Sequence, residues 1–277
     1  MIDEFLTTRT PMQTRDEFVK LLTWLPNASW TRVMTSEPAW REMEEFLPAF
    51  GFGPFATTLV LAGLNSVQLK GSADRVYWLS LRDRLSTVPV PASPSDLATV
   101  LKPFYEQERS AGMKAHRLRQ FLSSQLAVDL WRSTPGQVAK EYGQLWQRLA
   151  RVMNQRMELK TTASAMRCLG LALVMAGMHD FESELLLLPN DLRVRRLTEA
   201  LGQSTASDEV VRKYWAEILT DVRTTNPRVT MIHLDSFVWQ VADDVSEPAV
   251  RAYCRSMQMG EIGDAIASLI GRGRHDR

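Results

Sequence analysis

The sequence is poor in the residues that build metal and cluster sites. Its 277 residues include only 2 cysteines and 4 histidines. Cys168 and Cys254 lie far apart, which excludes an iron–sulfur cluster or a four-cysteine zinc site built from this chain. One disulfide between them is conceivable, although a reduced cytosolic chain is the simpler expectation. The histidines are scattered and no HExxH motif occurs, so we expect no metal site.

Motifs for nucleotide binding and serine hydrolysis are also absent. The sequence contains no GxGxxG or GxxxxGK[ST] loop and no GxSxG elbow. No apolar run reaches about 18 residues, so no membrane span is expected. The first ten residues, MIDEFLTTRT, lack the apolar core of a signal peptide. We therefore expect a cytoplasmic protein.

The charge is almost balanced, with 33 Lys plus Arg against 32 Asp plus Glu. This balance excludes a polybasic coat protein but allows a nucleic-acid enzyme with a local basic groove. A hydrophobic fraction of 45% in 277 residues is ample for a buried core, which excludes wholesale disorder. Lysine is scarce, so a lysine at a mechanistic position is easy to notice. The lysines are Lys20, Lys70, Lys102, Lys114, Lys140, Lys160 and Lys213.

Apolar residues recur at intervals of three and four over long windows, which predicts an all-α fold. The Thr14-Arg-Asp-Glu17 sequence is typical of a capping box, and Asp191 is expected to cap a later helix. A proline-rich segment, 86–95, is predicted to be a linker. The predicted helices cover residues 14–25, 36–50, 54–69, 74–85, 96–106, 114–126, 137–152, 159–178, 191–201, 207–224 and 234–242, followed by a polar C-terminal helix.

Three segments of the second half carry residues suited to catalysis. Lys160 lies at the start of an apolar helix, where the helix dipole is positive and a neutral amine is favoured. A neutral amine can attack a carbon electrophile and form a Schiff base. A solvated lysine at a frayed helix end is the alternative interpretation of the same spacing.

The other two segments carry a carboxylate each. Asp191 can simply cap its helix, or it can stabilise positive charge in a pocket. The arginines that follow it, at 193, 195 and 196, can meet phosphates or form a solvated face. Asp235 and Trp239 are four residues apart, so they share a helical face and can together bind a flat base. A buried tryptophan beside a capping aspartate is the alternative.

Together and in this order, the three segments resemble the archaeal 8-oxoguanine DNA glycosylase family, an offshoot of the helix-hairpin-helix glycosylases. In that family a Lys-Thr pair opens the second hairpin helix, a P-x-D-x-R-V-x-x-L-T segment follows, and L-H-L-D-x-x-x-W closes the pocket. The matching residues here are Lys160-Thr161, Pro189 to Thr198 and Ile232 to Trp239. Weaker matches at 37–41, 69–78 and 114–119 extend the resemblance over about 35–245.

The resemblance implies a two-lobed helix-hairpin-helix glycosylase fold with its active site in the cleft between the lobes. One lobe, approximately 96–225, would carry the hairpin and the nucleophile. Residues 1–85 together with 226–277 would form the second lobe. The C-terminal part is expected to pair with the early helices, because the base pocket needs side chains from both.

The implied activity is that of a DNA glycosylase with lyase activity on modified double-stranded DNA. Lys160 would attack the sugar C1′ carbon, Asp191 would assist departure of the base, and β-elimination would nick the strand. The base must be flipped from the duplex to reach these groups. No metal or organic cofactor is required, and we expect a monomeric, nucleoid-associated enzyme.

The resemblance also implies roles for other residues. Those expected to bind the base are Trp78, Asn190, Asp235 and Trp239, together with the positions of Ala39 and Ser164. Those expected to bind the DNA backbone are Lys114, Arg117, Arg119 and Arg156. Tyr77 becomes the stacking residue in place of Trp78 if the alignment shifts by one residue.

Two positions depart from the family pattern. The family has a phenylalanine four residues after the nucleophile, where this chain has Ser164, and a base-reading glutamine where this chain has Ala39. Hydrogen-bonded discrimination is lost when the groups that read a substrate are removed. We therefore expect a different or bulkier base, such as a hypermodified or glycosylated pyrimidine of phage DNA, and a role in defence; 8-oxoguanine itself is the alternative substrate. The alternatives are a non-catalytic DNA-binding protein on the same fold and a helical scaffold without a DNA role.

Overall fold

The computed structural model of the protein describes residues 10–71, 76–186, 188 and 191–275. Every regular element within these residues is a helix, and no strand occurs among them. The all-α prediction is therefore confirmed. The chain divides into two compact units. The central unit is Thr35–Leu187, and the terminal unit joins Met1–Met34 to Leu188–Arg277.

These bounds differ from the predicted lobes. The predicted linker, 86–95, lies inside the central unit, between α6 (Trp78–Ser86) and α7 (Pro94–Glu106). Ser93 caps α7 and Pro94 occupies its first turn, so the last proline of the segment starts a helix. The pairing of the N-terminal helix with the C-terminal segment is common to the prediction and the observed division.

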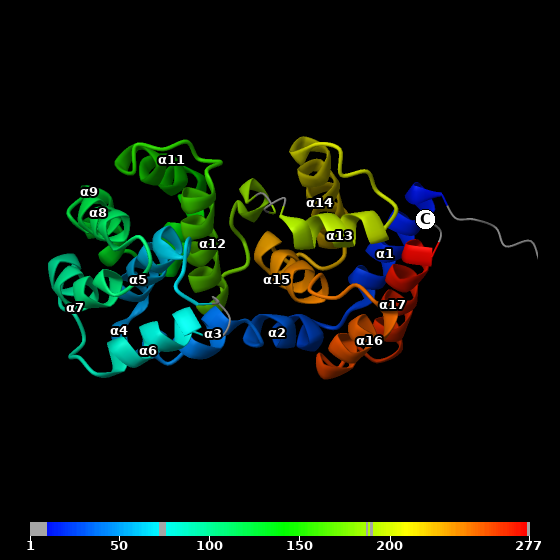
Figure 1. Cartoon of the computed structure of the whole chain (residues 1–277), viewed down its shortest axis with the longest axis horizontal. Helices are drawn as coiled ribbons and strands as arrows, with labels where there is room; N and C mark the ends of the chain where they lie inside the picture. The colour runs from blue at the N-terminus through cyan, green and yellow to red at the C-terminus, as the bar shows by residue number, and fades with distance from the viewer. Residues whose placement is uncertain (1–9, 72–75, 187, 189–190, 276–277) are drawn as a thin grey trace, which may run out of the picture. The chain divides into compact units, whose positions relative to one another are not determined.

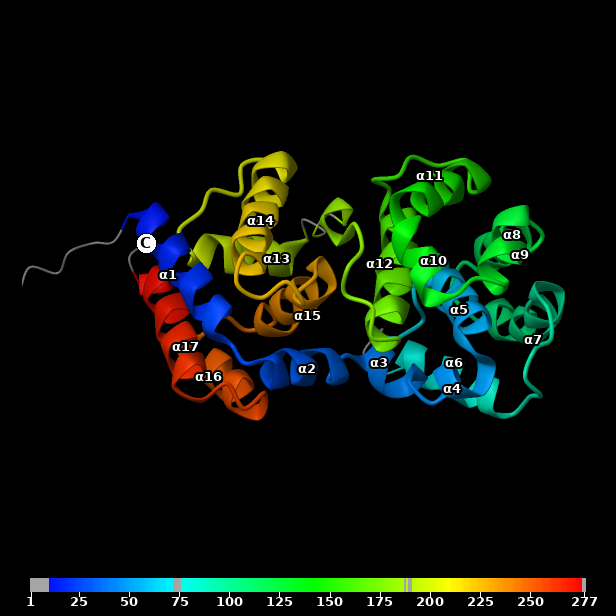
Figure 2. The same ribbon diagram turned by 180° about the vertical axis from the view of Figure 1, so that it is seen from behind.

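The central unit contains Lys160, the predicted nucleophile. Its other helices are α3 (Pro38–Met43), α4 (Phe46–Phe50), α5 (Phe52–Asn65), α8 (Ala111–Leu122), α9 (Gln125–Trp131), α10 (Pro135–Lys140), α11 (Tyr142–Val152) and α12 (Lys160–Met175), with a 3-10 turn η2 (Ser183–Leu185). The apolar helices α5 and α12 lie side by side at its centre (Figures 1 and 2).

A glycine permits the close approach of α5 and α12. A Cβ atom on Gly63 would lie 2.6 Å from the Ala165 Cα and 2.6 Å from the Ser164 carbonyl oxygen. Both atoms belong to the backbone, so neither can move aside cheaply. The backbone of α12 at Ser164 and Ala165 is therefore in direct contact with α5, which fixes the helix that begins with Lys160.

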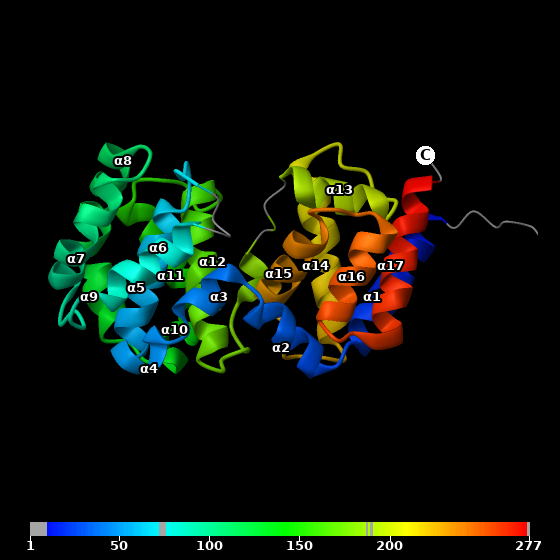
Figure 3. The same ribbon diagram turned by 60° about the horizontal axis from the view of Figure 1, so that its bottom comes forward.

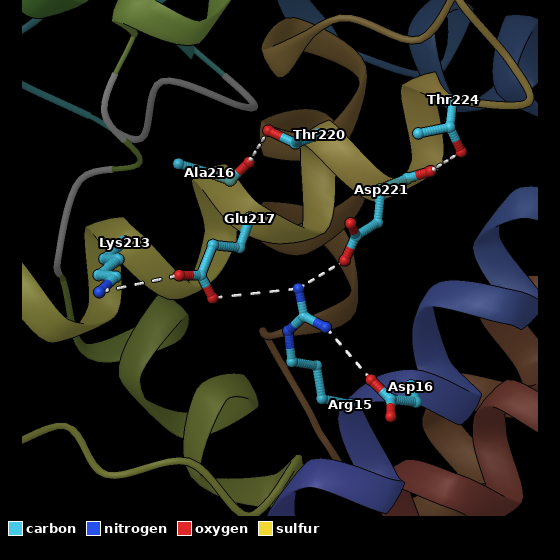
Figure 4. A network of polar contacts seen from close by, with 8 residues as sticks. All are labelled: Arg15, Asp16, Lys213, Ala216, Glu217, Thr220, Asp221 and Thr224. Carbon is cyan, nitrogen blue, oxygen red and sulfur yellow. Dashed lines mark hydrogen bonds and ion pairs between the residues drawn. The ribbon is translucent and has the colours of Figure 1, made fainter.

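The terminal unit contains the two predicted carboxylates. Its helices are α1 (Pro11–Trp24), α2 (Asn27–Thr35), α13 (Leu192–Ala200), α14 (Asp208–Arg223), α15 (Met231–Val241), α16 (Glu247–Ser256) and α17 (Gly260–His275). Helices α16 and α17 pack as a pair (Figure 3). Arg15 joins α1 to α14 by an ion pair with Asp221 at 2.6 Å, and Glu217 lies 4.0 Å away (Figure 4).

Several predicted helix boundaries are wrong at the N-terminal ends. Helix α1 starts earlier than the predicted residue 14, because Thr10 and Gln13 form the capping box instead. Helix α15 starts at Met231 rather than Leu234, because Thr230 and His233 form another such box. Asp191 does cap α13, as predicted.

Other predicted helices are divided or were missed. The predicted helix 36–50 is α3 and α4, the predicted helix 137–152 is α10 and α11, and the C-terminal helix is α16 and α17. Helices α2 and α9 were not predicted. The predicted start at Asp74 lies outside the described residues.

Candidate active site

Lys160 is the first residue of α12 and is exposed. The preceding turn is tied down by the hydroxyl of Thr162, which lies 2.9 Å from the carbonyl oxygens of Arg156, Met157 and Leu159. The indole of Trp146 on α11 donates to the Met157 carbonyl at 3.0 Å. These bonds hold the turn between α11 and α12, so the lysine projects from a fixed backbone.

Ser164 and Arg167 share one face of α12 with Lys160, because the three are spaced by four and three residues. The Ser164 hydroxyl forms a 2.8 Å hydrogen bond with Ser66, which caps the C-terminal end of α5. The Arg167 guanidinium pairs with Glu37 at 2.7 Å. Polar contacts with other helices therefore continue along this face beyond the lysine.

Glu37 connects α12 with the helix of Ala39. It is the N-cap residue of α3, and its side chain is only 4% exposed. Ala39 lies in the first turn of α3 and is itself buried. A methyl group there supplies no hydrogen-bonding group to a base. The structure thus anchors the helix of Ala39 to the helix of Lys160 through the Glu37–Arg167 pair.

Tyr77 and Trp78 are both buried at the start of α6. The Tyr77 hydroxyl donates to the Ala62 carbonyl of α5 at 2.8 Å and lies 3.3 Å from the Tyr105 hydroxyl. Burial raises the pKa of Tyr77 well above its ordinary value. Tyr77 therefore belongs to the core beside α5, and the stacking of a base on Trp78 stays a prediction.

Asp191 caps α13 with its side chain. One carboxylate oxygen accepts hydrogen bonds from the backbone N–H groups of Arg193 at 3.0 Å and Val194 at 3.1 Å. The carboxylate lies at the positive end of the helix dipole, where acidic side chains favour helix formation. Capping and a catalytic role are compatible, because the bonded oxygen leaves the second oxygen of the carboxylate for another partner.

Trp239 on α15 contacts the same segment through Arg193. The guanidinium carbon of Arg193 lies 4.3 Å from the centroid of the Trp239 ring. Arg193 also forms an ion pair with Asp243 at 2.9 Å. One residue therefore connects the capping carboxylate, the tryptophan and a second carboxylate.

Asp235 is one helical turn before Trp239 on α15 and is 6% exposed. His233 on the same helix accepts the Thr230 N–H at Nδ1, so it caps α15 locally. Helices α13 and α15 pack together, and the terminal unit thus gathers Asp191, Asp235 and Trp239 on two adjoining helices. Asn190 lies outside the described residues.

The AGOG family, described as N-glycosylase/DNA lyase, matches residues 19–265 of this sequence. The chain belongs to this family. It is a DNA N-glycosylase and DNA lyase. Among solved structures, the crystal structure of 8-oxoguanosine-complexed Pa-AGOG, an 8-oxoguanine DNA glycosylase from Pyrobaculum aerophilum, matches with a TM-score of 0.66 and 17% identity, covering 94% of this chain and 96% of that one. A comparison with curated proteins gave no match.

Two of the residues predicted to bind the DNA backbone in this AGOG-family enzyme are buried instead. Lys114 is 0% exposed and pairs with Glu108 at 3.0 Å. Arg117 is 8% exposed and donates to the Leu64 carbonyl at 3.0 Å, and burial lowers its pKa. A phosphate cannot reach a cation held in this way, so the prediction is wrong for both. Arg119 and Arg156 are exposed and stay candidates.

The enzyme thus carries its predicted site residues in two groups. Lys160, Ser164, Ala39 and Trp78 belong to the central unit, and Asp191, Asp235 and Trp239 belong to the terminal unit. The ion pairs of Arg167 with Glu37 and of Arg193 with Asp243 were not predicted, because the partners are far apart in the sequence and belong to no recognisable motif. No metal-binding cluster of His, Cys, Asp and Glu occurs within the described residues, nor any helix there that could span a membrane.

Proposed function

We propose that this enzyme excises a modified base other than 8-oxoguanine through a Schiff base on Lys160. The supporting observation is the exposed amine of Lys160 on the first residue of a helix whose preceding turn is fixed by Thr162. A fixed backbone lowers the ordering cost of placing a nucleophile, because only the side chain must still be ordered. DNA backbone contacts are proposed for the exposed Arg119 and Arg156.

In the proposed reaction the neutral Lys160 amine attacks the C1′ carbon of the flipped nucleotide. The bond from C1′ to the base breaks, and the base leaves with a proton. Opening of the sugar ring then gives an iminium between Nζ and C1′, from which β-elimination cleaves the strand on the 3′ side. Asp191 stabilises the positive charge that develops on the sugar during departure of the base.

The proposal of a different base is supported by what Ser164 and Ala39 lack. Neither provides an aromatic face, and the Ser164 hydroxyl is already bonded to Ser66 at 2.8 Å. Stacking on an aromatic side chain contributes about 1–3 kcal/mol per base. Without these contacts, selection for 8-oxoguanine is weakened, which favours a bulkier base such as a glycosylated or hypermodified pyrimidine. Such bases occur in phage DNA, so we propose a defence role for a monomeric, nucleoid-associated cytoplasmic enzyme.

Borohydride trapping tests the chemistry. Duplexes carrying 8-oxoguanine, glucosylated 5-hydroxymethylcytosine or a bare abasic site are incubated with the enzyme and reduced. We expect a covalent adduct on the abasic duplex and on a bulky base, and its loss in Lys160→Gln. Lys140→Gln is the matched control, because Lys140 is an exposed lysine of the same unit.

Asp191→Asn keeps a capping oxygen but removes the charge, so it should slow base release while preserving the fold.

The alternative is a non-catalytic DNA-binding protein on this fold. It predicts no adduct on any duplex, including the abasic one, together with salt-dependent binding that Lys160→Gln barely affects. Efficient excision of 8-oxoguanine with none of bulky bases would leave the Schiff base intact and refute the proposed substrate.

A further inference from the structure

Trp239, which we expect to stack on the flipped base, is already covered on one face. The Arg193 guanidinium carbon lies 4.3 Å from the Trp239 ring centroid, which is the geometry of a cation–π contact. Only one planar group can stack on each face of an indole ring. A base that stacks on Trp239 must therefore use the opposite face, or displace the arginine.

Displacement of Arg193 is opposed by its other contacts. The guanidinium forms an ion pair with Asp243, a largely exposed residue, at 2.9 Å. The backbone N–H of Arg193 donates to Asp191 at 3.0 Å, so its Cα is fixed in the first turn of α13. Helix α13 is itself anchored by the bond from the Trp215 indole to Thr198 at 2.9 Å. The arginine is thus held by its backbone N–H, by the contact of its guanidinium with the indole ring, and by its ion pair.

Two carboxylates belong to the same pair of helices as Trp239. Asp191 caps α13, and Asp235 lies one turn before Trp239 on α15, so a positively charged base bound near either would be attracted to it. Asp243 pairs with Arg193, but its side chain is 73% exposed and water screens its charge. Arg193 places a positive charge directly against the ring.

We propose that Arg193 is a positioning residue that holds Trp239 and makes the site select uncharged or anionic bases over cationic, alkylated purines. The inference rests on the proposed function, because it requires that a flipped base stacks on Trp239. A cation on one face of the indole weakens the attraction of the other face for a second cation, and the two charges also repel each other. An uncharged base suffers neither effect.

Single-turnover excision of N7-methylguanine, which is cationic, and of 8-oxoguanine, which is neutral, tests the selection. We expect Arg193→Gln to raise the ratio of the first rate to the second by roughly tenfold, since two unit charges across a ring interact appreciably even when partly screened. Arg193→Lys keeps the charge and should leave the ratio unchanged. Arg195→Gln is the matched control, because Arg195 lies on the same helix and pairs with Asp208 at 3.3 Å. Reactions without enzyme correct for spontaneous loss of N7-methylguanine.

The abasic duplex separates failure of this inference from failure of the proposed function. Adduct formation there needs no base, so it should be the same in wild type and Arg193→Gln. If the wild type forms no adduct on it, the proposed function fails first. If adducts form but the ratio is unchanged, or Arg193→Gln accelerates excision of both bases alike, the charge selection is refuted. If the wild type excises neither probe, the charge selection is supported only when Arg193→Gln newly excises N7-methylguanine. If Arg193→Gln does not excise N7-methylguanine either, the charge selection is refuted.

Discussion

The hydroxyl of Ser164 lies 2.8 Å from that of Ser66 and joins α12 to α5 one turn after Lys160. In the family pattern this position carries a stacking phenylalanine. A serine here satisfies its own hydroxyl against a neighbouring helix and leaves no ring for a base. The helix that carries Lys160 is thereby bonded to its neighbour at the position where the resemblance implies a base-stacking ring.

Ser164→Phe should move the specificity toward 8-oxoguanine. A ring at this half-buried position restores a stacking surface worth about 1–3 kcal/mol, which corresponds to roughly tenfold or more in the excision rate. Loss of the bond to Ser66 should lower the free energy of unfolding by about 1 kcal/mol. Single-turnover excision of 8-oxoguanine measures the gain. Ser164→Ala, which loses the bond without adding a ring, should show the stability loss alone; an equal rate increase there would contradict the stacking explanation.

Gly63→Ala should destabilise the central unit and misplace Lys160. The added Cβ would lie 2.6 Å from backbone atoms of Ser164 and Ala165, so α5 and α12 must separate. Overpacking of this kind costs about 1–3 kcal/mol. The control is Gly112→Ala on α8, where a Cβ meets nothing within 4 Å. Urea unfolding should show a loss only for Gly63→Ala, with adduct formation on abasic DNA reduced in parallel. Equal stability of the two variants would show that the helices can separate freely.

Lys114→Met should cost stability rather than DNA binding. Removal of the lysine leaves the Glu108 carboxylate, itself 10% exposed, without its ionic partner. Breaking a buried ion pair by removing one partner costs about 3–5 kcal/mol. Arg119→Ala, at an exposed position of the same helix, should change stability by less than about 0.5 kcal/mol but lessen the salt dependence of duplex binding. Urea unfolding and binding titrations at several salt concentrations measure both; the reverse pattern would restore Lys114 as a phosphate ligand.

The local sequence predicts where the helices lie better than it predicts the residues at which they begin and end. The period of apolar residues identifies α12 and α14 because each has 16 residues, which is long enough to show it. The sequence around Thr14 fits a capping box and predicts this residue as the cap of α1, but Thr10 fits one equally well and is the residue used. The choice between two such boxes depends on which turn packs against the neighbouring helices, and a local pattern does not contain that information.

The site shows the same limit over longer distances. Asp191 was predictable as a cap because its role depends on residues two and three positions later. Lys114 and Arg117 were misassigned because the groups that bury them, Glu108 and the Leu64 carbonyl, are brought near only by tertiary packing. The contact of Arg193 with Trp239 spans two helices and was equally invisible.

Substitution of two buried tyrosines, Tyr142 and Tyr214, should change the free energy of unfolding differently at neutral pH and in the same direction at alkaline pH. The Tyr142 hydroxyl donates to the Met166 carbonyl at 2.7 Å, whereas the Tyr214 hydroxyl has no hydrogen-bond partner among the described residues. Tyr142→Phe should therefore lower the free energy of unfolding by about 1 kcal/mol at pH 7. Tyr214→Phe should leave it unchanged or raise it slightly, because it removes an unsatisfied polar group.

Above the ordinary tyrosine pKa of about 10, both variants should lose less stability than the wild type. Burial raises the pKa of Tyr142 and of Tyr214, so the folded protein keeps protons that the unfolded chain releases. Stability then falls as pH rises through this range, by at most about 1.4 kcal/mol per pH unit for each such tyrosine. Phenylalanine removes one of these protons and makes the fall shallower. Urea unfolding at pH 7, 9 and 10.5 measures it; a Tyr214→Phe loss at pH 7 equal to that of Tyr142→Phe would mean that the Tyr214 hydroxyl is hydrogen-bonded after all.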